Sequence, residues 1–164
     1  MKQGYLDFFL PVEGKIREQR RVMLPERWQN SSVEFLVGDA QALPFRRHTF
    51  DAVACLNLID KIPFPRFHLL EVDRVSLPEK ARFLLSDPYS WSLEVANEED
   101  WLGGTVRGPN QGKGEDNVIS LMTGTEPQVK PPWRLEGKGA LWWKIRNHLN
   151  HFELIRSRYV KFSR

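Results

Sequence analysis

Residues 51–87 read DAVACLNLIDKIPFPRFHLLEVDRVSLPEKARFLLSD, and their pattern indicates the class of fold. The run Ala52–Ile59 is apolar without alternation, which is typical of a central strand of a parallel sheet covered on both faces. The segment Arg66–Val75 carries apolar residues at the spacing of one helical face, with a proline at its start. Ala81–Ser86 is a second apolar run. We therefore predict a strand, a helix and a parallel strand.

The flanking sequence extends this pattern in both directions. Val33–Val37 (VEFLV) is apolar and β-branched and predicts a buried strand that ends at Gly38-Asp39. Trp133–Arg146 and Ser157–Phe162 predict an antiparallel pair that closes the sheet. We expect a single α/β domain over residues 1–164, divided into an irregular lead-in (1–30), core βαβ units (31–102), a loop or lid with a small helix (103–132) and a closing hairpin (133–164). Within the lead-in, residues 15–24 suit a short helix or an exposed strand.

Composition excludes several classes of protein. The chain has 164 residues, of which 41% are hydrophobic and 27% are charged, as in ordinary globular domains. Its single cysteine rules out an internal disulfide framework and a multi-cysteine zinc site. No apolar run approaches the ~20 residues of a membrane span, and no secretory signal is visible. We expect a cytoplasmic protein without membrane or metal.

Positive charge is concentrated at the end of the chain. Residues 130–164 contain nine of the 24 Lys and Arg residues but only two of the 21 Asp and Glu residues. Such a tail suits either the solvated outer face of a hairpin or a nucleic-acid-binding module. It lacks the aromatic and glycine patterns of common RNA-binding modules, so we favour the solvated face.

Short polar groups follow each predicted core strand. They are Gly38-Asp39-Ala40, Asn57 to Asp60, and Ser86 to Tyr89. Ligands of open α/β sheets bind at the carboxyl ends of the strands, so these groups are candidate binding residues. Each also has a plain structural interpretation, because Gly-Asp is common in turns and Asn57 could cap the next helix.

These residues also carry a resemblance to a known family. VEFLVGDAQALPF (33–45), TFDAV (49–53) and RFLLSDPYSW (82–91) resemble the second half of class I S-adenosylmethionine-dependent methyltransferases of the methyltransferase type 11-like group. LPVEGKIREQR (10–20), WLGG (101–104) and IRNHLNHFE (145–153) are similar to the methyltransferase domain of ovothiol synthase and its stand-alone relatives. That resemblance implies a Rossmann-like, doubly wound sheet and N-methylation of the imidazole of a mercaptohistidine.

The resemblance also implies roles for particular residues. Asp39 and Ala40 would contact the adenine of S-adenosylmethionine, and Asn57 and Leu58 would line its methionine side. Residues that match the subfamily signature would bind the small-molecule acceptor: Tyr89, Trp91, Trp101, Gly103, Gly104, Arg146 and His148. No catalytic nucleophile or base is implied, because methyl transfer from a sulfonium needs chiefly alignment of donor and acceptor. Apart from this role, we expect His148 and His151 to be core or surface histidines and not metal ligands.

Two departures from the family pattern affect the expected activity. The Gly-rich loop after the first strand is absent, and so is the acidic residue that holds the ribose hydroxyls. The chain thus resembles an N-terminally truncated member whose sheet lacks its first strands. We expect impaired methyl transfer, or else a non-catalytic methyltransferase-like remnant that acts as an interaction module. An uncovered sheet edge would also favour a homo-oligomer or a partner chain.

Overall fold

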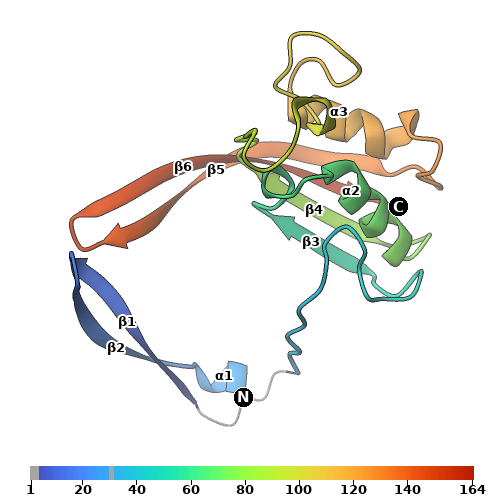
Figure 1. Cartoon of the computed structure of the whole chain (residues 1–164). Helices are drawn as coiled ribbons and strands as arrows, with labels where there is room; N and C mark the ends of the chain where they lie inside the picture. Colours follow the sequence, from blue (N-terminus) through green and yellow to red (C-terminus); the bar gives the residue numbers. More distant parts are fainter. Residues whose placement is uncertain (1–3, 30–31) are drawn as a thin grey trace. The chain divides into compact units, whose positions relative to one another are not determined.

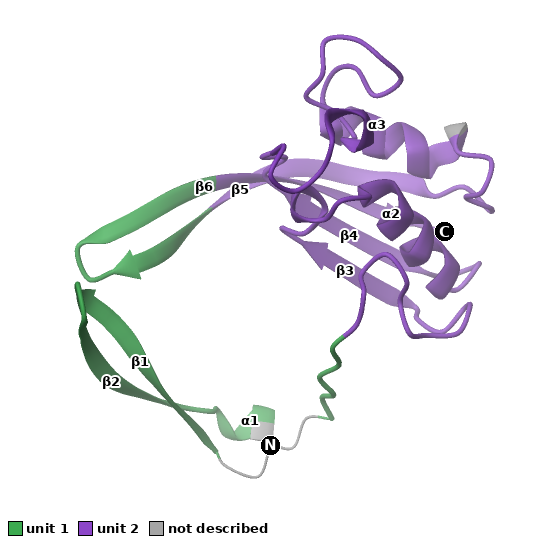
Figure 2. Ribbon diagram, viewed as in Figure 1, with its two compact units in different colours: residues 1–37, 143–155 green, residues 38–142, 156–164 purple. Residues whose placement is uncertain are grey.

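The computed structural model describes residues 4–29 and 32–164. Their contacts group into two compact units, whereas the sequence suggested one domain. One unit comprises residues 1–37 and 143–155, and the other comprises residues 38–142 and 156–164 (Figure 2). The two long C-terminal strands contribute to both units, since their outer ends belong to the first and their inner ends to the second.

The larger unit is built on a mixed four-stranded sheet in the order β3-β4-β6-β5 (Figure 1). Strand β3 (Ala52–Leu56) runs parallel to β4 (Arg82–Asp87), and β4 runs antiparallel to β6 (His151–Ser163). Strand β5 (Arg134–His148) lies beside β6 and turns back into it as a hairpin. This confirms the predicted α/β class with a parallel core and a C-terminal antiparallel pair.

The core lies between this sheet and helix α2 (Pro65–Val75). Pro65 occupies the first turn of α2, where its missing N–H costs nothing, and the helix ends at Ser76, whose hydroxyl donates to Val72 O at 2.6 Å. The rings of Phe83 and Phe162 stack at 5.8 Å between centroids. Burial of each such side chain contributes about 1.5–3 kcal/mol of hydrophobic stabilisation. The fully enclosed residues include Leu69, Val72, Phe83, Leu85, Val118, Met122, Val160 and Phe162.

Strand β3 is not covered on both faces as its apolar run predicted. Only Cys55 is fully buried, while Ala52, Ala54 and Leu56 are exposed. No helix or second sheet packs on the face that carries these three residues, within the described residues. A hollow of about 580 Å³ lies along this face and is lined by Ala54, Leu84 and Phe162 among others. The strand is also shorter than predicted, because Asn57 adopts a left-handed conformation (φ 54°) that ends it.

The predicted strand at Val33–Val37 is wrong. Residues 32–38 have no regular structure, and Phe35 and Val37 are 81% and 104% exposed relative to the reference state. Apolar β-branched residues form a strand only where a neighbouring strand supplies hydrogen bonds and cover. No such partner is present for this segment among the described residues.

The expected irregular lead-in is largely a β-hairpin of the smaller unit. Strand β1 (Tyr5–Glu13) pairs with β2 (Ile16–Met23), and the short helix α1 (Glu26–Gln29) follows. Arg21 on β2 donates two hydrogen bonds to the Asp7 carboxylate at 2.6 and 2.7 Å. Of the two alternatives for residues 15–24, the exposed strand is therefore correct.

The segment between β4 and β5 is a long loop with short helical turns. It contains η2 (Glu98–Asp100), α3 (Gly114–Ser120) and the π-helical turn η3 (Leu121–Thr125), while η1 (Ile59–Lys61) follows β3. The Asn117 amide fixes this loop by donating to the carbonyl oxygens of Leu102 and Asn110 at 3.0 and 2.9 Å. Within the described ranges, no helix combines the length and the apolarity that crossing a bilayer requires.

Candidate functional site

The carboxyl ends of the parallel strands β3 and β4 meet at one edge of the sheet, as the sequence predicted. Asn57 follows β3 directly, and its backbone N–H donates to Ser86 O on β4 at 2.6 Å. Its side-chain oxygen accepts a hydrogen bond from the Ser157 hydroxyl on β6 at 2.8 Å. Asn57 therefore connects the carboxyl ends of β3 and β4 to the middle of β6, and its expected contact with the cofactor stays a prediction.

Two buried carboxylates connect the loops that leave β3 and β4. Asp87 is fully buried, and its oxygens accept the backbone N–H groups of Ile59 at 3.1 Å and Tyr89 at 2.8 Å. Asp60, equally enclosed, accepts the N–H of Ser90 at 2.7 Å. Burial, reinforced by the nearby charge of Asp60, raises the pKa of Asp87 to about 7. The sequence showed aspartates at these strand ends but not that they hold each other's loops.

An aromatic cavity of about 520 Å³ opens directly after β4. Tyr89 and Trp91 form one wall, with ring centroids 6.1 Å apart, and Gly104 lies against Trp91. Trp101 stacks behind Trp91 at 6.4 Å with an interplanar angle of 15°. The volume is in the range of small-molecule binding sites. Of the predicted acceptor residues, Tyr89, Trp91 and Gly104 line this cavity and Trp101 supports it.

Close packing explains why glycines occupy positions 103 and 104. A Cβ atom on Gly104 would lie 2.8 Å from Trp91 Cδ1, and one on Gly103 would lie 2.3 Å from the backbone nitrogen of Gly114. Both distances are shorter than van der Waals contact permits. Gly104 also has a φ of 82°, which side-chain-bearing residues rarely adopt. The Gly103-Gly104 pair therefore fixes the approach of the loop to the aromatic wall.

Charged side chains form the other wall of the cavity. Glu115 accepts hydrogen bonds from Arg158 Nε at 2.5 Å and Nη2 at 3.1 Å, and from Lys138 Nζ at 3.0 Å. These contacts, Arg158 first, lower the pKa of Glu115. Arg156 and Asp116 also line the space. The sequence analysis did not predict this charged wall. The feature that could have indicated it is the basic C-terminal segment, which we interpreted as a solvated face.

Asp39 and Ala40 lie in the loop that enters the larger unit. Asp39 is exposed, and its Oδ1 accepts the N–H of Gln41 at 2.8 Å in a local turn. The carbonyl oxygen of Ala40 lies 2.8 Å from His68 Nδ1 on α2. The structural interpretation of Asp39 as a turn residue and its expected adenine contact are compatible, because an exposed carboxylate can accept further hydrogen bonds.

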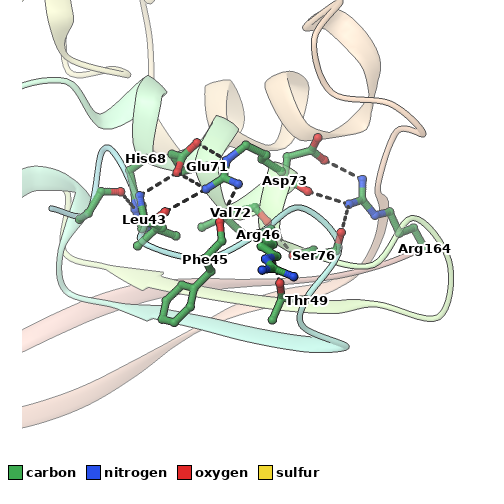
Figure 3. Close-up of polar contacts among 12 residues, drawn as sticks. Leu43, Phe45, Arg46, Thr49, His68, Glu71, Val72, Asp73, Ser76 and Arg164 are labelled. Carbon is green, nitrogen blue, oxygen red and sulfur yellow. Dashed lines mark hydrogen bonds and ion pairs between the residues drawn. The ribbon is translucent and has the colours of Figure 1, made fainter. Parts of the chain in front are cut away.

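Helix α2 holds the rest of this loop through one ion pair (Figure 3). Arg74 donates to both oxygens of Glu71 at 2.6 and 2.7 Å, and also to the carbonyl oxygens of Phe45 and Leu43 at 2.8 and 3.0 Å. Glu71 in turn accepts the N–H of Leu43 at 2.7 Å. The loop between Gly38 and Phe45 is thus fixed to the helix by groups at both of its ends.

Three remaining predicted residues have separate surroundings. Leu58 packs against the core of the larger unit and precedes η1. Arg146 and His148 belong to the smaller unit. There the Arg146 guanidinium lies 5.0 Å from the Phe152 ring, and the rings of His148 and His151 are 5.5 Å apart. These contacts are the ordinary packing of a hairpin tip.

The sheet and its strand-end site define a class of fold, the Rossmann-like fold of S-adenosylmethionine-dependent methyltransferases. A methyltransferase from Methanosarcina mazei described as S-adenosylmethionine-dependent superposes with a TM-score of 0.50 at 18% identity, covering 79% of this chain and 66% of that one. A protein solved in work on the conversion of a disulfide bond into a thioacetal group during echinomycin biosynthesis gives 0.51 at 14% identity, covering 81% and 57%. The chain therefore spans about two thirds or less of the length of these structures.

A family match agrees with the fold. Residues 12–82 match a family described as a methyltransferase domain, which is somewhat less than half of the chain. This segment includes the loop of Asp39 and Ala40, strand β3 and helix α2. No protein with a curated description matches this sequence. The fold is thus like that of a solved methyltransferase, and the first half of the sequence matches a methyltransferase domain.

Proposed function

We propose that this protein is an S-adenosylmethionine-dependent methyltransferase that acts in the cytoplasm on a small molecule with an imidazole ring, of the mercaptohistidine type. The observation that carries the proposal is the aromatic cavity beside the ends of β3 and β4, where α/β sheets bind ligands. Tyr89, Trp91 and Gly104, three of the residues that resemble the acceptor signature, line this one cavity.

Four residues suit the two ends of the cofactor. The exposed carboxylate of Asp39 can accept the adenine amino group, and the backbone of Ala40 lies beside it. Asn57 and Leu58 stand at the end of β3, where the methionine part would lie. In the sheet of the larger unit no strand precedes β3 within the described residues, so no acidic group after such a strand is available for the ribose hydroxyls. The residues present therefore suit the adenine and methionine ends of the cofactor but not its ribose. We propose that the affinity for the cofactor is reduced for this reason.

The chain's own residues have a limited part in the chemistry. S-adenosylmethionine, when bound, would supply a sulfonium methyl group whose carbon an acceptor nitrogen can attack in line, with the sulfur leaving as a neutral thioether. Tyr89 and Trp91 would hold a flat ring and exclude water from the reacting atoms. Their faces also favour a nearby positive charge. A neutral imidazole nitrogen already carries the attacking lone pair, so no residue needs to act as a nucleophile or metal ligand.

One observation favours a second candidate, a non-catalytic interaction module. The face of the sheet formed by Ala52, Ala54 and Leu84 is not packed against another layer in the described parts of the chain. An uncovered apolar face of this kind suits a partner chain. The two candidates share the fold and differ only in whether cofactor and acceptor are used.

Methyl transfer to 4- or 5-mercaptohistidine, followed by mass spectrometry of the small molecule, tests the proposal. We expect a slow gain of one methyl group on the imidazole that requires S-adenosylmethionine. Trp91→Ala should reduce the rate, because it removes the aromatic wall, whereas Trp28→Ala, on α1 outside the cavity, should not. Methylation of proteins alone would refute the small-molecule assignment, and no methylation of any acceptor would favour the interaction module.

A further inference from the structure

The aromatic cavity has an excess of positive charge on the wall that faces Tyr89 and Trp91. Its lining includes four basic residues and two acidic ones: Lys113, Lys138, Arg156, Arg158, Glu115 and Asp116. At neutral pH these side chains carry a net charge of two positive units. A concave site lined mainly by one sign of charge concentrates ligands of the opposite sign.

One of these cations is held in a fixed direction. Glu115, only 6% exposed, uses both carboxylate oxygens to bind Arg158 through Nε and Nη2. A guanidinium has five N–H donors, so three remain on Arg158 after these two contacts. Because the ion pair fixes the plane of the guanidinium, these donors are already oriented before a ligand arrives. That arrangement lowers the entropy cost of binding a planar anion such as a carboxylate.

A second cation at this mouth, Arg156, forms no ion pair with a carboxylate in the part of the chain that the structure describes. Its guanidinium lies 5.8 Å from the centre of the Trp142 ring. It is exposed, so it can turn toward a bound anion. Two polar atoms of the aromatic wall, Tyr89 Oη and Trp91 Nε1, are buried without hydrogen-bond partners among the described residues. Such groups are costly in a ligand-free site and suggest that a ligand completes this wall.

We infer that this cavity binds an organic anion, a flat ring that packs on Tyr89 and Trp91 and bears a carboxylate directed to Arg158 and Arg156. This inference rests on the proposed function in one respect, which is that the anion is identified as the methyl acceptor. Binding itself requires neither the cofactor nor methyl transfer. The anionic group sets the orientation of the ring, so that a neutral analogue of the same shape binds poorly.

Calorimetric titration of the full chain without S-adenosylmethionine tests this inference. Two matched pairs of probes serve: imidazole-4-acetate with its amide, and phenylacetate with its amide. We expect each acid to bind about tenfold more tightly than its amide, since charge-assisted hydrogen bonds to guanidinium are lost in the amide. The preference should decline as salt is added, because the cations lie at a solvent-facing mouth.

Two variants that alter the cavity's charge in opposite directions make the test sharper. Arg156→Gln removes an exposed cation and should weaken binding of the acids about threefold or more, with little change for the amides. Asp116→Asn removes an anion whose side chain is 60% exposed, and should tighten binding of the acids by about twofold. Both sites are exposed enough for the variants to fold, which circular dichroism and thermal unfolding will verify.

The outcomes separate this inference from the proposed function. Binding of phenylacetate but neither imidazole probe would support the anion site and refute the imidazole acceptor. Binding of both acids with the expected response of the two variants supports both. Equal affinity for acids and amides, unchanged affinity in the variants, or no binding of any probe would overturn the anion site.

Discussion

Asp87 is the residue whose environment departs most from what its position in the sequence indicated. The motif DPYSW places it at a strand end, among the groups that the sequence offered as candidate binding residues. Its two oxygens instead accept backbone N–H groups from the loops after β3 and β4. It thereby positions Tyr89, and it does so while buried beside the second carboxylate, Asp60.

This burial predicts a pH-dependent stability. The pKa of Asp87 is about 7 in the folded protein, against an ordinary value near 4 in the unfolded chain. The folded state therefore binds one more proton between these values, so stability is greatest at the acidic end and is lost as the pH rises through about 7. The slope for one proton is at most about 1.4 kcal/mol per pH unit. Urea unfolding from about pH 4.5 to pH 8 measures it.

Two variants decide whether this slope belongs to Asp87. Asp87→Asn should flatten the fall in the free energy of unfolding over that range. Asp51→Asn, at an exposed aspartate just before β3, should leave it as in the parent chain. A slope that is unchanged in Asp87→Asn would contradict the assignment, whatever the absolute stability of the variant.

At the scale of elements, the correct predictions were those for strands and helices that pack against segments close to them in the sequence. Strands β3 and β4 and helix α2 were predicted from apolar runs and helical spacing, because each packs on the next. Residues 33–37 were wrongly predicted to be a strand, strand β1 was missed, and β2 was predicted only as one of two alternatives. Val33–Val37 has the composition of a strand but no partner strand, whereas β2 has a partner but almost no apolar pattern.

The candidate site was predictable to a similar extent. The residues of the aromatic wall could be named because DPYSW and WLGG resemble the signature of a known methyltransferase subfamily. The charged wall could not, because Lys138 and Arg158 come from β5 and β6 and reach Glu115 only through the antiparallel pairing of distant segments. A basic composition gives no information on which face of a strand carries the charge.

The contacts between α2 and the loop of Asp39 predict a local effect on dynamics. Arg74→Lys loses the forked contact with Glu71 and the hydrogen bonds to Leu43 and Phe45. We expect faster amide hydrogen exchange in residues 39–45 and a stability loss of about 1–3 kcal/mol, as for other charge-assisted hydrogen bonds. Arg66→Lys, on the same helix but paired with Glu126, is the control. Exchange that is accelerated equally in both variants would contradict a specific clamp.

At the scale of the whole molecule, the four-stranded sheet has an open edge at β3 within the described residues. Leu56 on this edge strand is 58% exposed, and it lies on the uncovered face that also carries Ala52 and Ala54. Unpaired edges with apolar neighbours favour pairing with another chain. The opposite edge strand, β5, pairs only with β6 in the described residues, and it also exposes apolar side chains, Leu141 and Trp142 among them.

The β3 edge predicts self-association. Light scattering after size exclusion should show a mass that rises with concentration, and Leu56→Lys should lower it, because a charge on an edge strand opposes pairing. Leu93→Lys, at the same residue type in the loop after β4, where the side chain is 74% exposed, provides the control. A monomer at every concentration in the parent chain would show that the edge is inert.

The most direct test of the account is binding of S-adenosylmethionine itself. Isothermal titration of the full chain should give saturable heat, and Asp39→Asn should weaken binding about tenfold, because a charged acceptor for the adenine amino group is replaced by a neutral one. Asp51→Asn serves as the control at a nearby exposed carboxylate. Saturable binding that depends on Asp39 would support a methyltransferase. The result that would contradict it is the absence of heat at about millimolar cofactor, where a binding free energy of roughly −4 kcal/mol would still be detected. The chain must unfold cooperatively in the same experiment series, so that the result comes from folded protein.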